Sequence, residues 1–163
     1  MAFAFVFPGQ GSQSVGMMAA YGDSAVVRAT FDEASAALGQ DLWQLVAEGP
    51  AEALAQTVNT QPVMLTSAIA VWRLWLEKGG RKPAVVAGHS LGEYSALVAA
   101  GILEFKEAVP LVRLRATAMQ EAVPAGVGGM AAIMGLDDEG VRAGCAEAAE
   151  GQVVEAVNFN GGQ

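Results

Sequence analysis

The chain has 163 residues, of which 53% are hydrophobic and 16% are charged, and its formal net charge is −8. This composition argues against disorder and is sufficient for one hydrophobic core of ordinary size. The negative charge and the lack of a Lys/Arg cluster argue against a nucleic-acid surface and against binding to anionic membranes.

Cysteine and histidine each occur once, as Cys145 and His89. One cysteine cannot form an internal disulfide, and with a single histidine beside it the chain offers no metal-ligand cluster. We therefore expect no metal and a reducing, cytoplasmic compartment. The apolar N-terminus has no basic residue before it and is interrupted by Pro8, which argues against a signal peptide or a membrane span.

The first predicted element is a strand at residues 3–7, a continuous apolar run typical of a strand covered on both faces in a parallel sheet. Pro8-Gly9-Gln10-Gly11 ends it abruptly. This loop lacks the third glycine of a dinucleotide fingerprint and the lysine of a phosphate-binding loop. What remains is a loop of backbone N–H groups at the carboxyl end of a strand, which can supply an oxyanion donor.

Helix signals fill the stretch between residues 24 and 78. Helices are predicted at 24–38, 42–48, 51–56 and 59–78. Pro62 falls in the first turn of the last helix, where its missing N–H is tolerated, and Trp72 and Trp75 are expected in the core. The order of a strand, several helices and a second strand near residue 85 indicates a parallel α/β sheet.

The central motif is Gly88-His89-Ser90-Leu91-Gly92, which follows an apolar run and precedes a helical pattern. Gly-x-Ser-x-Gly at a strand-to-helix turn is the spacing of a nucleophile elbow, in which glycines prevent collisions and the serine hydroxyl is exposed. The backbone N–H of Leu91 and the positive end of the helix 91–100 would face an oxyanion beside Ser90. The pentapeptide alone also fits an ordinary turn, but its setting favours the elbow.

Arg115 is the second chemically informative residue, in a helix predicted over about 105–121. A helical wheel places Arg115 at the centre of an apolar arc and Arg113 on the opposite face. The arc is formed by Ala108, Leu111, Val112, Ala118 and Met119. A buried guanidinium needs an anionic partner, either an internal carboxylate or a ligand's carboxylate or phosphate, and spacing alone slightly favours the internal pair. Pro110 predicts a bend or a later start of this helix.

A glycine-rich junction near Pro124 divides the chain into two predicted domains, 1–124 and 125–163. The second contains strand-like segments at 130–134 and 153–159 around a helix at about 138–149. This β-α-β unit is interpreted as the first half of a small ferredoxin-like α+β subdomain. The predicted fold class is α/β, with a hydrolase-like parallel sheet and nucleophile elbow followed by the start of this subdomain.

A serine nucleophile needs a base within hydrogen-bond reach, usually a histidine. His89 directly precedes Ser90, and adjacent side chains diverge as they leave a sharp turn. We therefore expect His89 to be structural or to line a pocket. Either the base lies beyond Gln163 or the chain is not a complete catalyst.

The chain resembles the N-terminal half of the malonyl-CoA:acyl carrier protein transacylases of bacterial type II fatty-acid synthesis. The resemblance covers essentially all 163 residues and rests on several separated motifs in the right order. The motifs are Phe5-Val6-Phe7-Pro8-Gly9-Gln10-Gly11-Ser12-Gln13, Asn59-Thr60-Gln61-Pro62, Gly88-His89-Ser90-Leu91-Gly92-Glu93-Tyr94-Ser95, Arg115 with Met119-Gln120, and Val157-Asn158-Phe159-Asn160.

The resemblance implies that Ser90 takes a malonyl group from malonyl-CoA as an ester and passes it to the phosphopantetheine thiol of acyl carrier protein, with no cofactor. It implies an oxyanion hole made by the backbone N–H groups of Gln10 and Leu91. It also implies that Arg115 binds the malonyl carboxylate, which favours the ligand interpretation of this arginine.

The remaining implied site residues are Gln61, His89 and Met119, which would line the substrate pocket. The catalytic histidine of the family lies downstream of the residues matched here, so the isolated chain is expected to be slow or inactive. Missing strands would leave apolar sheet edges open, and the chain is therefore expected to self-associate.

Alternative functions are the acyltransferase domain of a polyketide synthase, a serine hydrolase, and a catalytically incomplete fragment that binds acyl-CoA or a carrier protein. Arg115 and the loop after the first strand argue against the hydrolase. No basic patch for an acidic carrier protein is evident in the sequence.

Overall fold

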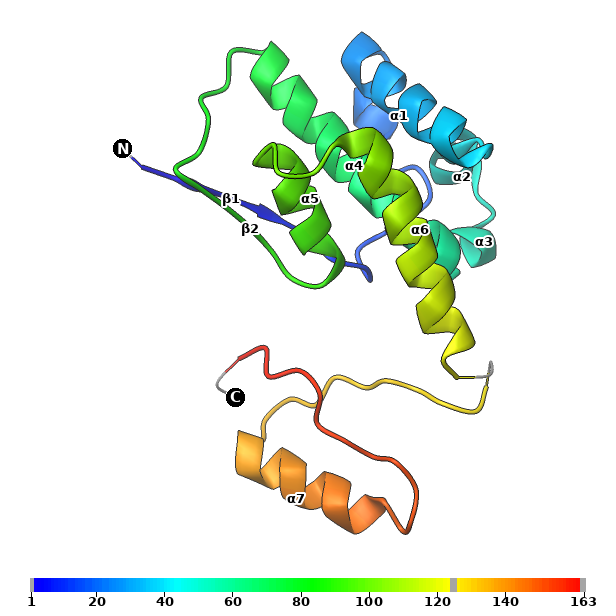
Figure 1. Ribbon diagram of the computed structural model, residues 1–163, viewed down its shortest axis with the longest axis vertical. Coiled ribbons are helices and arrows are strands. Elements are labelled where there is room, and N and C mark those ends of the chain that lie inside the picture. Colours follow the sequence, from blue (N-terminus) through cyan, green and yellow to red (C-terminus); the bar gives the residue numbers. More distant parts are fainter. Residues whose placement is uncertain (1, 124–125, 162–163) are drawn as a thin grey trace. The chain divides into compact units, whose positions relative to one another are not determined.

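A computed structural model describes residues 2–123 and 126–161 (Figure 1). The chain divides into two compact units, Met1–Ala125 and Gly126–Gln163. The elements of the first unit are β1 (Ala4–Phe7), the 3-10 helix η1 (Ala19–Tyr21), α1 (Ala25–Leu38), α2 (Leu42–Glu48), α3 (Ala51–Ala55), α4 (Thr57–Glu77), β2 (Val85–Gly88), α5 (Leu91–Ala99) and α6 (Phe105–Glu121). The second unit contains α7 (Asp138–Ala148).

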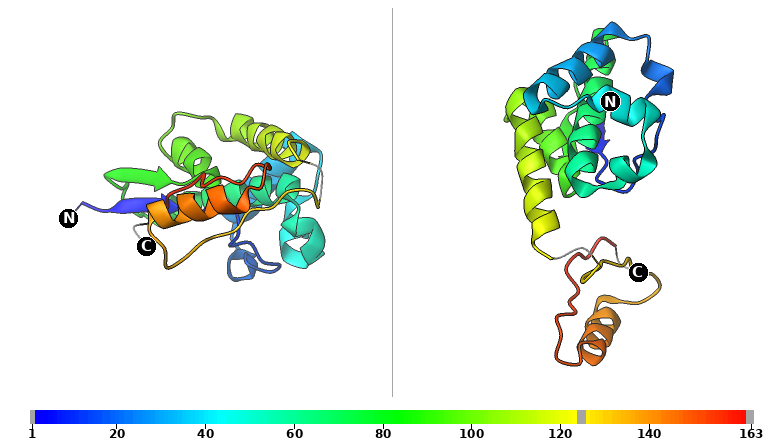
Figure 2. Two further views of the ribbon diagram at one scale, coloured as in Figure 1. Left: turned by 90° about the horizontal axis from the view of Figure 1, so that it is seen from below. Right: turned by 90° about the vertical axis from the view of Figure 1, so that its right-hand side faces the viewer.

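The two strands pair in parallel, with Phe5 opposite Val86 and Phe7 opposite Gly88. They lie side by side in both Figure 1 and Figure 2. Parallel strands require a long crossover connection, which α1 to α4 supply here. The predicted parallel α/β arrangement is confirmed, and it brings the loop after β1 next to the turn after β2.

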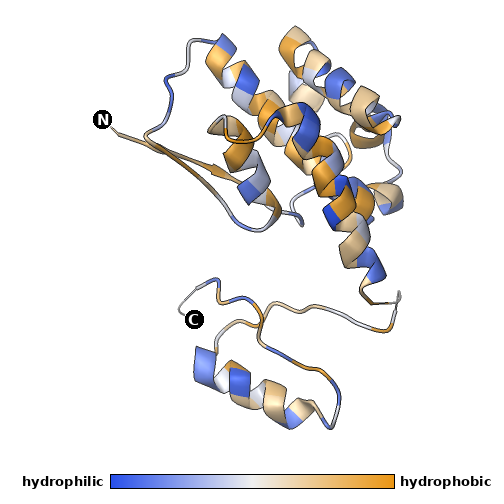
Figure 3. Cartoon of the chain, in the orientation of Figure 1, coloured by the Kyte–Doolittle hydropathy of each residue, from blue (hydrophilic) through white to orange (hydrophobic). Residues whose placement is uncertain are grey.

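Only one face of this sheet is covered by the described residues, which corrects the expectation of a strand covered on both faces. Side chains alternate between the faces of a strand, so Phe5, Phe7 and Val86 share one face. There they pack with α4 and α5, and the ring centroid of Phe5 lies 5.2 Å from that of Trp72. On the other face Val6 is 74% exposed and Val85 is 59% exposed. Figure 3 shows β1 as hydrophobic along its length, so hydropathy alone did not reveal the open face.

The core of the first unit is helical and is centred on α4. Most of its fully buried apolar side chains come from α1, α4 and α6, and include Val27, Phe31, Leu65, Ile69, Val109 and Val112, and Leu42 and Val46 of α2 and Leu91 of α5 belong to the same cluster. Phe31 also makes an edge-to-face contact with Trp43 of α2, with centroids 5.1 Å apart. The order and type of these helices agree with the sequence-based prediction, and α1, α2, α3, α5 and α6 match the predicted bounds to within one residue.

The helix ends follow from local chemistry. The Ser24 hydroxyl accepts a hydrogen bond from the Val27 N–H at the start of α1, and Asp41 caps α2 in the same way through the Gln44 N–H. Gly39 ends α1 in the left-handed region, with φ at 63°, where a side chain is disfavoured. These capping residues are the reason why the boundaries were predictable.

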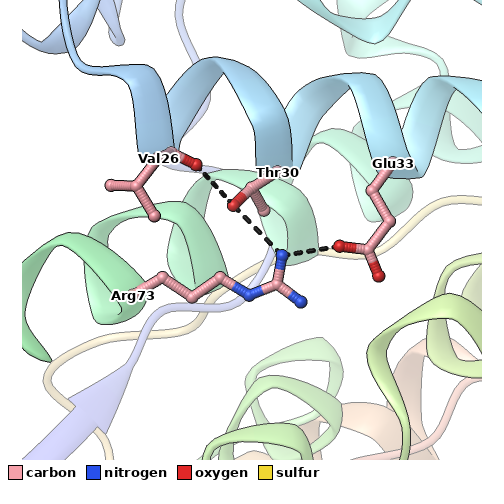
Figure 4. A network of polar contacts seen from close by, with 4 residues as sticks. All are labelled: Val26, Thr30, Glu33 and Arg73. Carbon is pink, nitrogen blue, oxygen red and sulfur yellow. Dashed lines mark hydrogen bonds and ion pairs between the residues drawn. The ribbon is translucent and has the colours of Figure 1, made fainter. Parts of the chain in front are cut away.

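An ion pair connects α1 with α4 (Figure 4). Arg73 donates from Nη1 to Glu33 Oε2 at 2.6 Å and to Thr30 Oγ1 at 3.2 Å. Thr30 in turn donates to the carbonyl oxygen of Val26 at 2.8 Å. Both charged side chains are partly exposed, so the pair contributes about 0–1 kcal/mol and serves mainly to fix how the two helices meet.

Two expectations about helix α4 and one of the two alternatives for α6 were wrong. α4 begins at Thr57, before the predicted start at residue 59, so Pro62 lies in the second turn and removes one intrahelical donor there. Trp75 is 40% exposed because it packs at the margin of the sheet and donates from Nε1 to the Arg81 carbonyl at 3.0 Å. Pro110 lies inside α6, which starts at Phe105, so the alternative of a later helix start is excluded.

The second unit is built around α7, which begins after Asp137, whose carboxylate accepts the Gly140 N–H at 2.8 Å. The segments at 130–134 and 153–159, predicted as strands, form no strand among the described residues. A strand is defined by backbone pairing, and neither segment has a pairing partner in this unit. Their side chains are largely exposed, with Met134 at 87% and Val153 at 89%.

No helix in the described part of the chain has both the length and the apolarity needed to cross a membrane.

A matched pair of leucines tests the position of the core. Leu65→Ala on α4 removes a side chain with no exposed area, and we expect it to lower the free energy of unfolding by about 2–5 kcal/mol. Leu114→Ala on α6 removes a side chain that is 66% exposed, and we expect a change within about 0.5 kcal/mol. Urea unfolding followed by circular dichroism measures both, and equal losses would contradict this core.

The open sheet face gives a second prediction. Because Val6 and Val85 expose apolar surface on the same open face of the sheet, the chain is expected to self-associate, and the double variant Val6→Thr/Val85→Thr should shift it toward the monomer. Threonine keeps the β-branched shape that suits a strand. Size-exclusion chromatography with light scattering measures the mass, with Val123→Thr as the control. A monomeric parent chain would be the contrary result.

Candidate active site

Ser90 lies between β2 and α5 in an uncommon backbone conformation, with φ at 55° and ψ at −115°. A positive φ is rare for a residue with a side chain, and it costs about 1–3 kcal/mol unless the surroundings enforce it. Ser90 is the N-cap of α5, but its side chain makes no capping hydrogen bond. The hydroxyl therefore remains available to groups outside the helix.

Gly88 and Gly92 explain how this conformation is enforced. A Cβ atom on Gly88 would lie less than 3.0 Å from the backbone of Gly92, and one on Gly92 would lie less than 3.0 Å from the carbonyl oxygen of Phe7. The ends of both strands and the start of α5 thus meet with no space for a side chain. The spacing of the two glycines around Ser90 is required by this contact.

Arg115 of α6 donates a hydrogen bond from Nη2 to Ser90 Oγ at 2.9 Å. Its Nη1 donates to Gln61 Oε1 of α4 at 2.7 Å, and the guanidinium carbon lies 5.7 Å from the centre of the Tyr94 ring. No Asp or Glu among the described residues forms a salt bridge with Arg115. The internal ion pair, which spacing alone had slightly favoured, is therefore wrong.

Hydrogen-bonded amide side chains connect Arg115 with the loop after β1. Gln61 donates from Nε2 to Met119 Sδ at 3.3 Å and to Gln10 Oε1 at 3.5 Å. Gln10 donates from its own Nε2 to Thr57 Oγ1 at 3.4 Å. Side chains from α4, α5, α6 and the first loop thus converge beside Ser90.

The two backbone N–H groups predicted as oxyanion donors have no hydrogen-bond acceptor within the described residues. Leu91 is the first residue of α5, and the first N–H groups of a helix have no intrahelical acceptor. Gln10 follows β1, and its N–H has no hydrogen-bond acceptor within the described residues. The Leu91 side chain itself is buried in the core at 1% exposure, which anchors the start of the helix.

His89 is exposed, and its side chain makes no hydrogen bond within residues 2–123 and 126–161. Its carbonyl oxygen instead accepts the Gly92 N–H at 2.9 Å and closes the turn. In the described part of the chain, Ser90 Oγ has no imidazole or carboxylate as a hydrogen-bond partner. The site as described therefore contains a cation beside the serine but no base.

The structure places the two arginines of α6 differently from the prediction that the helical wheel gave. The buried residues of α6 are Phe105, Ala108, Val109, Val112 and Ala116. At 100° per residue, Arg113 and Arg115 flank this stripe on its two sides. The wheel was centred wrongly because it counted Leu111 and Met119 as buried, although they are 40% and 45% exposed.

Arg113 is the arginine that burial affects more. Its Nη2 donates to Gln40 Oε1, while its Nε is buried without a partner among the described residues. This desolvation lowers the pKa of the guanidinium. Arg113 thus has a structural contact with the end of α1, and Arg115 alone reaches Ser90.

Sequence reasoning did not single out Thr57 and Tyr94. Tyr94 is four residues after Ser90, one turn further along α5, so helical spacing could have suggested that it shares the face of the serine. Thr57 was missed because the start of α4 was placed two residues too late. Once α4 begins at Thr57, this residue and Gln61 lie one turn apart on the same face.

The fold and the site together define an α/β protein with an exposed serine in a strand-to-helix turn and an arginine within hydrogen-bond distance of it. The sequence matches the family model "Acyl transferase domain" over residues 4–161. The chain belongs to the acyl transferase family.

Known members of this family are close in sequence and structure. The malonyl CoA-acyl carrier protein transacylase of Salmonella typhimurium is 61% identical over 159 residues, which cover 97% of this chain and 52% of that protein. The crystal structure of an acyl-carrier-protein S-malonyltransferase from Burkholderia pseudomallei has a TM-score of 0.94 at 68% identity, and covers 99% of this chain and 53% of that chain.

A further similar structure is a malonyl-transacylase solved with the acyl carrier protein of a type II polyketide synthase, with a TM-score of 0.94 and 55% identity, covering 99% of this chain and 53% of that chain. In each comparison the chain spans about half the length of the relative it matches.

A glycine pair tests the geometry of the Ser90 turn. Gly88→Ala forces a Cβ into the backbone of α5, and we expect a loss of about 1–3 kcal/mol in the free energy of unfolding. Gly22→Ala is the control, because Gly22 has φ at −59° and a Cβ there would meet its nearest atom at 3.5 Å, an ordinary contact. Thermal unfolding of both variants measures this loss. A Gly88→Ala protein with the same stability as the parent would contradict the close approach of the backbone segments.

Proposed function

We propose that this chain carries the nucleophile and the acyl anchor of a malonyl transferase that moves a malonyl group from malonyl-CoA to the phosphopantetheine thiol of acyl carrier protein, in fatty-acid biosynthesis. The observation that carries the proposal is the contact of Arg115 with Ser90 at 2.9 Å, without a carboxylate partner for the arginine among the described residues. A nucleophile beside an uncompensated cation suits an acyl group that ends in a carboxylate.

In this proposal the turn from β2 through Ser90 to α5 is a nucleophile elbow. Its support is the positive φ of Ser90 and the two glycines whose Cβ atoms would collide with backbone. Ser90 Oγ attacks the thioester carbonyl of malonyl-CoA, the C–S bond breaks, and free CoA leaves with a proton on sulfur. The carrier-protein thiol then attacks the Ser90 ester and releases the serine.

The oxyanion that forms at each addition step is assigned to the backbone N–H groups of Gln10 and Leu91. Both lack an intramolecular acceptor within the described residues, and Leu91 adds the positive end of a nine-residue helix. These donors are fixed before the reaction, because one belongs to a helix in the core and the other to a loop packed against the Ser90 turn.

The malonyl carboxylate is assigned to Arg115, where it takes the place of Ser90 Oγ as the acceptor from Nη2. A guanidinium can bind a carboxylate through two parallel hydrogen bonds, and a charged pair of this kind is stronger than the serine contact it replaces. Met119 and His89 are assigned to the walls of the acyl site. A serine hydrolase would need the same turn but would leave Arg115 without a role.

The proton of Ser90 requires an acceptor, which is not found next to Oγ in the described residues. We assign this role to a histidine outside them, as the resemblance implies. The names of the relatives support malonyl-CoA and acyl carrier protein as substrates. The relative that was solved with a polyketide carrier protein supports polyketide synthesis as a second setting for the same chemistry.

The second unit, Gly126–Gln163, is proposed as the first half of a ferredoxin-like subdomain, with α7 as its helix. Its 130–134 and 153–159 segments would pair only with strands that the described residues do not contain. The reaction is proposed to take place in the cytoplasm, where CoA thioesters and reduced thiols occur together.

Intact-mass analysis after incubation with malonyl-CoA tests the proposed function. The parent chain is expected to acquire one malonyl ester slowly, because a nucleophile without its base retains only a small part of the rate. Ser90→Ala should acquire none, and added acyl carrier protein bearing phosphopantetheine should remove the ester from the parent. Arg115→Gln should slow malonyl loading about tenfold or more and leave acetyl loading from acetyl-CoA unchanged.

Two controls accompany this experiment. Ser14→Ala removes another exposed hydroxyl and should load like the parent, and Arg81→Gln removes an exposed arginine outside the site and should not change the preference for malonyl. The absence of any ester on Ser90 after prolonged incubation would contradict the proposal. Release of free malonate without transfer to the carrier protein would favour the hydrolase.

A further inference from the structure

Gln61 is completely enclosed, although its implied role was to line the substrate pocket. Its exposed fraction is 0%. Its Oε1 is occupied by Arg115 at 2.7 Å, and its Nε2 faces Met119 at 3.3 Å and Gln10 at 3.5 Å. With every polar atom engaged by the protein, Gln61 has no group left to offer a ligand.

The neighbours of Gln61 determine which way its amide points. Arginine has only donors, so the oxygen must face Arg115. Met119 Sδ and Gln10 Oε1 are acceptors, so the nitrogen must face them. The reversed amide would place an NH2 group against the guanidinium, and each end of this side chain is therefore fixed by its own contact.

The two hydrogen bonds of Arg115 are of different kinds. The bond to Gln61 is part-buried, because its acceptor is a fully buried side chain on the core helix α4. The bond to Ser90 is made with an exposed hydroxyl in the turn before α5. A ligand can replace the exposed acceptor and leave the buried one in place.

The charge of the buried acceptor matters for the binding of an anion. A neutral amide holds Nη1 in position and leaves the full positive charge of Arg115 available to a carboxylate. A carboxylate at the same place would form a buried ion pair, which is weakly screened and would neutralise the site.

We propose that Gln61 is a positioning residue that sets acyl specificity: it holds Arg115 beside Ser90 without neutralising it, so that the site favours acyl groups that end in a carboxylate. This inference rests on the proposed function and deepens it. Its contact with Gln10 also links the acyl anchor to the loop assigned to the oxyanion, through one amide.

Gln61→Glu is the most direct test, because it replaces only the NH2 group of the side chain by oxygen. The resulting carboxylate would compete with the malonyl carboxylate for Arg115. The variant is made in a Ser90→Ala background, so that acyl-CoA binds without being consumed. Isothermal titration calorimetry then gives the dissociation constants of malonyl-CoA and acetyl-CoA. We expect the preference for malonyl-CoA to fall about tenfold or more, with the affinity for acetyl-CoA unchanged. A residue with a purely structural role would not alter this ratio.

Gln40→Glu is the matched control. Gln40 accepts a hydrogen bond from Arg113, the other arginine of α6, and this pair does not touch Ser90. The substitution introduces the same charge beside an arginine of the same helix, and the malonyl preference should be retained. Gln61→Met serves as a second variant if Gln61→Glu does not fold, because it removes the acceptor without adding charge and should lower the preference less.

The outcomes separate the inference from the proposed function. If the Ser90→Ala protein prefers malonyl-CoA and both Gln61 variants in that background keep the full preference, the role of Gln61 is overturned and the proposed function stands. If the Ser90→Ala protein has no preference for malonyl-CoA, both the inference and the proposed function are overturned. Loss of the preference in Gln61→Glu with its retention in Gln40→Glu supports the inference. Circular dichroism of each variant confirms that the compared proteins are folded.

Discussion

The close approach of three backbone segments at Gly88 and Gly92 is the constraint on which the site depends. The ends of β1 and β2 and the start of α5 meet there without side chains, and Ser90 is held in a conformation that it would not adopt alone. The strain in this one residue is offset by the packing around it, including the buried Leu91. The position of the hydroxyl is therefore a property of the whole α/β unit.

α4 supports the sheet and the site at the same time. Near its C-terminal end, Trp72 packs against Phe5 and Phe7 on the covered face of the sheet. Near its N-terminal end, Thr57 and Gln61 hold the side chains of Gln10 and Arg115. A change in how this helix packs would consequently alter both the packing of the sheet that ends at the serine turn and the side-chain contacts beside Ser90.

Much of this arrangement could be predicted from the sequence, because caps, glycine stops and the Gly-x-Ser-x-Gly spacing are local signals. Which face of a strand or helix is buried was harder to predict, since burial depends on the elements that pack against that face. Val6 is as apolar as Phe7 but is 74% exposed, and Arg115, which the wheel placed at the centre of an apolar arc, lies with Arg113 at the margins of one buried stripe. The partners of Arg115 come from α4 and the Ser90 turn, and no spacing within α6 could reveal them.

The pairing of Ala4 with Val85 has a consequence for folding kinetics. These two residues are separated by four α-helices and a 3-10 helix, so the sheet is a contact of high sequence separation. The entropy of closing such a loop must be overcome before the strands gain from pairing. The helices between them form from nearby residues and can pack first. We infer that the serine turn is among the last parts of the unit to be assembled. A chain stalled early in folding would therefore have a helical core without a reactive serine.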